Sequence, residues 1–167
     1  MVVATAIPVA EYLSTTYHPD CDYVDGQLQE RNVGEMDHGD AQASCVVYVR
    51  TKCTGFWAVT EVRVQLRPDR FRIPDVSIVR GGKPKTRIFT TPPLVAVEIL
   101  SPEDRASRLQ ERIDDYLAFG IPAIWVIDPE TRRGFIYTSE GMREAKDGIL
   151  RSHDGSLEVP LRSLFED

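Results

Sequence analysis

The 167-residue sequence lacks long apolar runs and the cysteine patterns that build disulfide frameworks. No stretch approaches the roughly 20 consecutive apolar residues of a transmembrane helix, and the apolar N-terminus carries no basic residue, so we expect neither a membrane span nor a signal peptide. The three cysteines, Cys21, Cys45 and Cys53, are odd in number and form no CxxC pair, which excludes a disulfide scaffold. We therefore expect a cytoplasmic protein.

Organic cofactors and phosphate loops also have no support in the sequence. The segment Gly81-Gly82-Lys83-Pro84 resembles a phosphate loop only superficially, because its lead-in and the Ser or Thr after the lysine are absent. We interpret it as a turn and expect no organic cofactor.

A strong positive charge is absent as well, since the formal net charge is −6. Such a charge argues against broad, nonspecific adhesion to nucleic acid. Residues 61–92 are the exception, with eight basic and three acidic side chains. This segment is either a solvated strand face or a surface that contacts DNA. Its basic residues are Arg63, Arg67, Arg70, Arg72, Arg80, Lys83, Lys85 and Arg87.

The length and composition indicate a single domain over residues 1–167. Apolar residues make up 42% and charged residues 28%, which is ordinary for a globular protein that buries its own core. We found no internal repeat and no low-complexity linker.

The first third of the chain predicts a helix, a hairpin and a second helix. Helix formers cover residues 8–18, and residues 22–31 form a hairpin around the Asp25-Gly26 turn. Apolar residues then recur at helical spacing from His38 to Lys52, with Asp37 as the expected N-cap.

The rest of the chain predicts strands around one more helix. Ser101 is the expected N-cap of that helix, Pro102 its first residue and Gly120 its C-cap. The tail adds a hairpin or an edge strand. The predicted strands cover residues 56–66, 71–79, 94–100, 123–127 and 134–138. This order favours an α/β fold, with a mixed sheet flanked by helices.

Glu98 lies in the middle of an otherwise apolar strand. A buried carboxylate is expensive unless it is paired, protonated or bound to a cation. One interpretation is therefore an ion pair with an arginine of the following helix, and the other is a metal site.

Asp75 strengthens the metal interpretation. Taken alone, it is best explained as a turn or bulge residue after Pro74. If its strand neighbours that of Glu98, however, the two like charges lie side by side and repel unless a cation lies between them. Mg²⁺ is suited to one or two carboxylates, retained waters and phosphate oxygens.

These residues carry a resemblance to a known family. The sequence resembles the Uma-type family of restriction-endonuclease-like proteins, part of the PD-(D/E)XK nuclease superfamily, over roughly residues 23–138. The matching segments are Arg72-Ile-Pro-Asp75-Val, Val97-Glu98-Ile-Leu-Ser101-Pro, Tyr116-Leu-Ala-Phe-Gly120-Ile-Pro and Trp125-Val-Ile-Asp128-Pro129.

The resemblance implies a restriction-endonuclease-like core of order αβββαβ and assigns roles to four residues. Asp75 and Glu98 become the metal-binding acids, and the backbone carbonyl of Ile99 completes the metal shell. His38, at the start of its helix, would position the substrate or transfer a proton.

One position departs from the superfamily pattern. A lysine is expected two residues after the second acid, where this chain has Leu100, or on the following helix, where it has Arg112. Arginine stabilises phosphate charge through its planar fork, but it does not deprotonate and cannot serve as a base. Arg105 and Arg108 share a helix stripe with Arg112 and form either a solvated flank or a phosphate-facing rim.

Two functions follow from these expectations. The first is a DNA endonuclease dependent on Mg²⁺, or alternatively Mn²⁺, that hydrolyses phosphodiester bonds with a metal-activated water and acts as a homodimer. The second is a catalytically degenerate protein of the same fold that binds nucleic acid or a protein partner. The roles of Glu30, Gln42 and Glu61 stay open.

Overall fold

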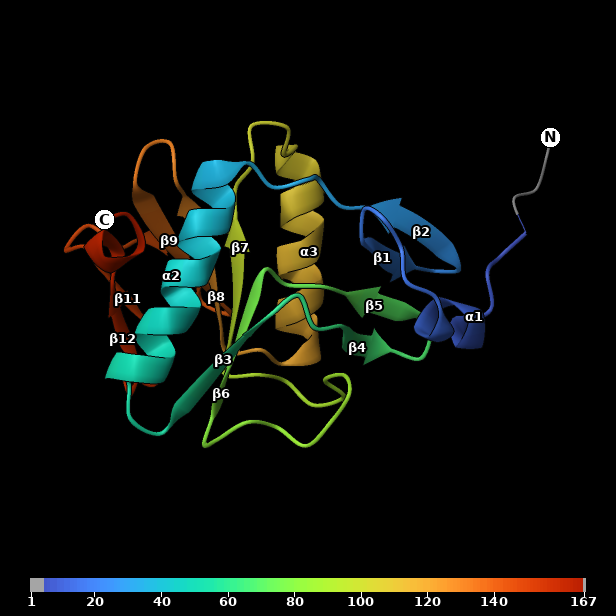
Figure 1. The fold of residues 1–167 in the computed structure, drawn as a ribbon, viewed down its shortest axis with the longest axis horizontal. Helices are drawn as coiled ribbons and strands as arrows, with labels where there is room; N and C mark the ends of the chain where they lie inside the picture. Colours follow the sequence, from blue (N-terminus) through green and yellow to red (C-terminus); the bar gives the residue numbers. More distant parts are fainter. Residues whose placement is uncertain (1–4, 167) are drawn as a thin grey trace.

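The computed structural model describes residues 5–166, so part of the N-terminal segment considered for a signal lies outside the described residues. Its centre is a six-stranded mixed sheet (Figure 1). The strand order is β10-β9-β8-β7-β6-β3, and only β7 and β8 run parallel. The strands are β3 (Phe56–Thr60), β6 (Val76–Arg80), β7 (Val95–Ile99), β8 (Ala123–Asp128), β9 (Arg133–Thr138) and β10 (Gly141–Glu144).

Two helices cover opposite faces of this sheet, α2 (Met36–Lys52) and α3 (Ala106–Phe119) (Figure 1). The α3 helix connects β7 to β8, because two parallel strands need a crossover. Alternate residues of β7 therefore serve two cores: Val97 packs on the α2 side and Ala96 on the α3 side.

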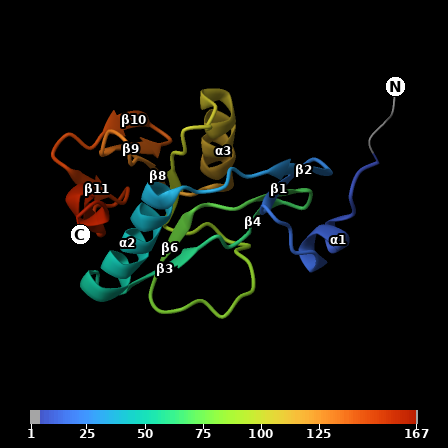
Figure 2. The ribbon, with the colours of Figure 1, turned by 45° about the horizontal axis from the view of Figure 1, so that its top comes forward.

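A second, antiparallel sheet lies beside the first, with strand order β2-β1-β5-β4 (Figure 2). The short helix α1 (Val9–Ser14) packs on it through an aromatic cluster of Tyr12, Tyr23 and Phe71. The strands are β1 (Cys21–Val24), β2 (Gln27–Glu30), β4 (Val64–Arg67) and β5 (Arg70–Arg72).

Of the hairpin or edge strand expected for the tail, the C-terminal segment forms a hairpin, β11 (Ile149–Arg151) and β12 (Glu158–Pro160), followed by the 3₁₀ helix η1 (Leu161–Leu164). It packs against the α2 face. Gly134 allows this close approach, since a Cβ there would lie 2.8 Å from a methyl group of Leu161.

The predicted fold class, a mixed sheet flanked by helices, is confirmed, whereas two predicted strands are wrong. Residues 56–66 are not one strand, because Glu61 adopts φ 52° and turns the chain from β3 into β4 of the other sheet. Residues 71–79 are likewise divided into β5 and β6 by the irregular segment Ile73–Asp75, where Pro74 has no N–H for a ladder. Both breaks carry the chain from one sheet to the other.

Three predicted helix boundaries are wrong, although the end of the third helix at Gly120 is confirmed by its φ of 99°. The first helix ends at Ser14 rather than at residue 18. The second begins at Met36, so Asp37 is inside the helix and not its N-cap. The third begins at Ala106, because residues 101–104 form a separate turn. In this turn the Ser101 N–H donates a hydrogen bond to the Asp104 carboxylate at 2.7 Å.

The basic segment 61–92 is not one continuous strand face, because it is divided between two sheets and a loop. Five of its eight basic side chains are engaged in contacts within the chain. The other three lie exposed in the loop between β6 and β7. The engaged residues are Arg63, Arg67, Arg70, Arg72 and Arg80, and the exposed ones are Lys83, Lys85 and Arg87.

Arg72 is the most deeply buried of these residues, at 2% exposure. Its guanidinium contacts Asp22 of β1 (3.0 Å) and Asp115 of α3 (2.7 Å), and so ties the smaller sheet to the helix that covers the larger one. Glu111 also contacts it, at 2.9 Å.

Among the described residues, no helix combines the length and apolar composition that crossing a membrane requires.

We predict that Arg72→Ala lowers the free energy of unfolding by about 3–5 kcal/mol, because it leaves buried Asp22 without its counter-charge. The matched control is Arg67→Ala on the same hairpin, whose side chain is 55% exposed and contacts Asp25. That change should lower stability by no more than about 1 kcal/mol. Urea denaturation measures both, and equal small losses would contradict the role given to Arg72.

Candidate active site

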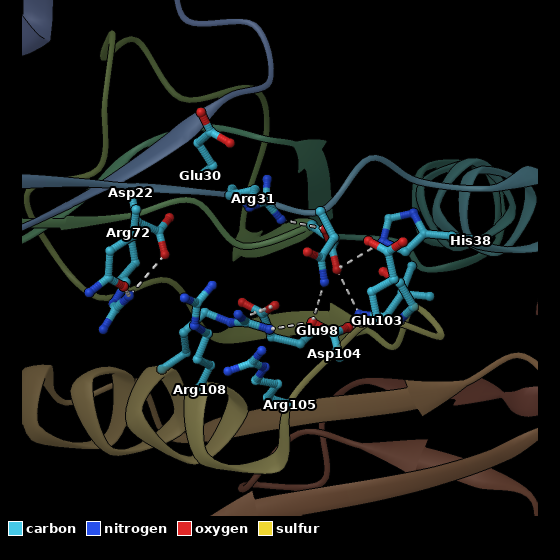
Figure 3. A pocket seen from close by; sticks show the side chains of 16 residues that line it. Asp22, Glu30, Arg31, His38, Arg72, Glu98, Glu103, Asp104, Arg105 and Arg108 are labelled. Carbon is cyan, nitrogen blue, oxygen red and sulfur yellow. Dashed lines mark hydrogen bonds and ion pairs between the residues drawn. The ribbon is translucent and has the colours of Figure 1, made fainter.

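A cavity of about 290 Å³ opens where the two sheets meet the start of α3, and we call it the acid-pair cavity (Figure 3). Its walls are almost entirely polar. The residues that line it are Asp22, Gln29, Glu30, Arg31, Asn32, His38, Arg72, Asp75, Glu98, Ile99, Ser101, Glu103, Asp104, Arg105, Arg108 and Arg112.

The strand register brings Asp75 and Glu98 opposite each other. Strands β6 and β7 pair Ser77 with Ala96 and Val76 with Val97, so position 75 faces position 98 one residue beyond the last pair. Both side chains are nearly inaccessible, at 3% and 2% exposure. Asp75 lies in the irregular segment after Pro74, not within a strand, as the turn interpretation expected.

Asp75 is held by donors from three parts of the chain. Its Oδ1 accepts a hydrogen bond from Arg31 Nη2 at 2.6 Å, and its Oδ2 accepts one from the Ile99 N–H at 2.7 Å. His38 Nε2 lies 3.4 Å from Oδ2. Burial alone would raise the pKa of Asp75, but these partners lower it below its ordinary value. Asp75 is therefore a carboxylate at neutral pH.

Glu98 is held from α3. Its Oε1 accepts a 2.6 Å hydrogen bond from the Tyr116 hydroxyl, and its Oε2 lies 3.2 Å from Arg112 Nε. That Arg112 nitrogen is buried and not aligned for a hydrogen bond, so the contact is mainly electrostatic. The pairing with an arginine of the following helix, one of the two interpretations of the sequence, is thus present.

The pKa of Glu98 moves opposite to that of Asp75. Burial raises the pKa of Glu98 to about 7, and the charge of Asp75 adds to the rise against the opposing effects of Arg112, Arg31 and the Tyr116 hydroxyl. Two acids in one cavity therefore differ in protonation, which is a common feature of functional sites.

His38 and Gln42 both reach Asp75 from the first turns of α2. The contact with Asp75 raises the pKa of His38 above its ordinary value, although burial opposes it. Gln42 Nε2 donates to the Asp75 backbone carbonyl at 2.8 Å. The His38 ring occupies space left by Gly34, where a Cβ would lie 2.9 Å from Nδ1. The α2 helix thus fixes both the backbone and the carboxylate of Asp75.

The remaining predicted residues separate into those that line the cavity and one that does not. Glu30, Arg105 and Arg108 line it, and Figure 3 shows Arg108 on α3 and Arg105 just before the start of that helix. Glu61 does not line it and contacts Gln42 instead, at 3.4 Å. Ile99 meets Asp75 through its N–H, whereas the resemblance had assigned a role to its carbonyl.

Sequence reasoning did not single out Arg31, and Arg72 and Asp22 were not expected at the site. Arg31 follows β2, more than forty residues from Asp75 in the chain. The burial of two acids indicates that cations must exist nearby, but nothing in the local pattern of residues 29–32 shows that one of them is Arg31.

The donor set fits a hard divalent cation in type, since it offers two carboxylates beside polar backbone. Within residues 5–166, however, no three His, Cys, Asp or Glu side chains converge on one point as a metal cluster would. All four carboxylate oxygens already face donors or cations. An ion held by Asp75 and Glu98 would therefore compete with Arg31 and Arg112.

The fold and the cavity define an α/β protein with a polar site between its two sheets, and comparison identifies the family. The chain matches Uma2, described as "Putative restriction endonuclease", over residues 9–162. It belongs to this family. No curated protein matches it.

The chain is also similar to a crystal structure described as a "putative nuclease belonging to DUF820" from Anabaena variabilis ATCC 29413. The TM-score is 0.78 and the identity 22%, with 95% of this chain and 97% of that chain covered. At this identity the match shows the shared fold.

The raised pKa of Glu98 predicts how stability depends on pH. A carboxyl whose folded pKa of about 7 exceeds its ordinary 4.5 stabilises the fold fully below pH 4.5, and this contribution is lost as pH rises through 7. We expect the free energy of unfolding to fall by up to about 3 kcal/mol between pH 5 and pH 8.

Glu98→Gln should remove most of this decline while keeping an acceptor for Tyr116. A smaller decline should remain, because His38 also has a raised pKa and loses its contribution as pH rises. Urea denaturation of both proteins across this pH range gives the measurement. An equally steep decline in Glu98→Gln would mean that Glu98 is ionised in the folded protein.

Proposed function

We propose that this protein is a divalent-metal-dependent DNA endonuclease whose ion is held by Asp75 and Glu98. The observation that carries the proposal is the pair of buried acids, opposite each other on neighbouring strands, in a cavity that is also lined by five arginines. Family membership and the fold support nuclease chemistry in general.

Mg²⁺, or Mn²⁺ in its place, would be held by Asp75 and Glu98, with the Ile99 carbonyl as a further ligand. When bound, such an ion polarises a phosphodiester and lowers the pKa of a water molecule. The protein supplies the rest. Arg112 stabilises negative charge on the phosphate, and Tyr116 keeps Glu98 oriented through its 2.6 Å hydrogen bond.

His38 is the candidate for proton transfer or substrate positioning. The contact with Asp75 raises its pKa, which favours the protonated ring, and it already faces the acid that would bind the ion. Gln42 keeps the Asp75 backbone in place beneath it. Because each chain has one acid pair, cutting both strands of a duplex requires a second copy, and we propose a homodimer.

A degenerate, noncatalytic nuclease fold is the second candidate, and one observation favours it. Among the residues that line the acid-pair cavity, none is a lysine, and Arg112 stands at the position where the family has one. Arginine stabilises charge but does not act as a base. If catalysis needs an ionisable amine, this chain binds nucleic acid without cutting it.

Plasmid cleavage with Mg²⁺ or Mn²⁺ distinguishes the two candidates. The endonuclease should nick supercoiled plasmid, and Asp75→Ala should reduce the rate at least about a hundredfold, because one of two ion-binding carboxylates is gone. The exposed control Arg143→Gln should cut like the unchanged protein.

Plasmid cleavage by Arg112→Lys shows whether the arginine at this position prevents catalysis. Activity that appears only in Arg112→Lys would support the degenerate protein. Unchanged cleavage by Asp75→Ala would contradict the assignment of the site.

A further inference from the structure

Arg31 links the smaller sheet to the acid pair of the larger one. It follows β2 directly, and its backbone N–H donates to the Asp20 carbonyl at 2.9 Å, which fixes its place beside that sheet. Its side chain, labelled in Figure 3, is 15% exposed. It reaches Asp75 with a 2.6 Å contact. A guanidinium thus lies where a divalent ion would bind.

The negative charges of both acids stabilise the Arg31 guanidinium. Burial alone would lower the pKa of Arg31, but Asp75 and then Glu98 raise it above its ordinary value. The Asp75 Oδ1 atom that accepts from Arg31 is also the oxygen with no other donor. Metal binding through this atom must displace the guanidinium.

The formal charges in the cavity indicate which kind of ligand the displaced Arg31 guanidinium would contact. Asp75 and Glu98, when ionised, balance Arg31 and Arg112 to a formal charge of zero. The other charged residues that line the cavity are four acids and three arginines, which add one negative charge: Asp22, Glu30, Glu103 and Asp104 against Arg72, Arg105 and Arg108. A divalent ion would add a charge of +2 to the neutral inner group of Asp75, Glu98, Arg31 and Arg112, and cations so close together repel strongly. Binding of the ion therefore favours the entry of an anion.

We propose that Arg31 is a positioning residue that couples metal binding to the binding of a nucleic-acid phosphate. Without metal, Arg31 holds Asp75. When the ion takes Asp75, Arg31 turns to an oxygen of the phosphodiester, which a guanidinium fork matches well. Each ligand then raises the affinity of the other, as linkage requires. This inference rests on the proposed metal site of Asp75 and Glu98.

The test is titration with Mn²⁺, with free ion measured by electron paramagnetic resonance, with and without a short phosphorothioate oligothymidylate that resists hydrolysis. In the unchanged protein, the oligonucleotide should tighten Mn²⁺ binding about fivefold or more. In Arg31→Gln, Mn²⁺ alone should bind about fivefold or more tighter, because its competitor is gone, and the gain from the oligonucleotide should fall below about twofold.

The matched control is Arg143→Gln, which removes the same charge from an exposed edge strand and should behave like the unchanged protein. Thermal unfolding by circular dichroism shows whether each variant folds. If Arg31→Gln does not fold, Arg31→Met, which fills a similar volume, gives the same comparison.

Two outcomes overturn the inference in distinguishable ways. If Arg31→Gln binds Mn²⁺ no tighter than the unchanged protein and keeps the full gain from the oligonucleotide, the coupling is wrong. The proposed metal site then stands, provided that Asp75→Ala loses Mn²⁺ binding. If neither the unchanged protein nor Arg31→Gln binds Mn²⁺, the proposed function fails and this inference fails with it.

Discussion

Two carboxylates buried side by side in a sheet impose a requirement on the rest of this fold. Like charges removed from water must be compensated by cations or protons, or the folded state is strongly destabilised. Here the compensation comes from three separate parts of the chain: Arg31 after β2, His38 on α2 and Arg112 on α3. The acid pair thus fixes where the smaller sheet and both helices lie.

A second network of charged residues, centred on Arg72, holds the chain next to the acid pair. Arg72 joins Asp22 of the smaller sheet to Asp115 of α3, and Asp22 also accepts the Ile73 N–H at 3.0 Å. Ile73 opens the irregular segment that ends at Asp75. The network therefore holds the segment that positions the acid, which explains why a chain would keep so many charges out of water despite their desolvation cost.

Much of the centre of this fold follows from local sequence. An apolar run around Glu98 predicts a covered strand with a buried acid, and Gly120 predicts the end of α3, because both depend on short-range patterns. The acid pair also follows, since the predicted strands 71–79 and 94–100 pair as neighbours. The resemblance to the family added the order of the elements.

Other features depend on contacts distant in sequence and were not predictable. The division of the strands at Glu61 and at Ile73–Asp75 places β4 and β5 in a different sheet, although local alternation runs through the first break. Arg31 reaches Asp75 only after both sheets have formed. The sequence of the basic segment 61–92 suggested a possible DNA-contacting surface, but four of its arginines pair with acids elsewhere in the chain.

The central claim is that Asp75 and Glu98 hold a divalent ion in place of their internal cations. The most direct measurement is anomalous X-ray scattering from crystals soaked in Mn²⁺. Our account predicts a peak between the two carboxylates, with the Arg31 guanidinium moved away from Asp75. A fully soaked crystal with no peak there, and with Arg31 still bound to Asp75, would contradict it.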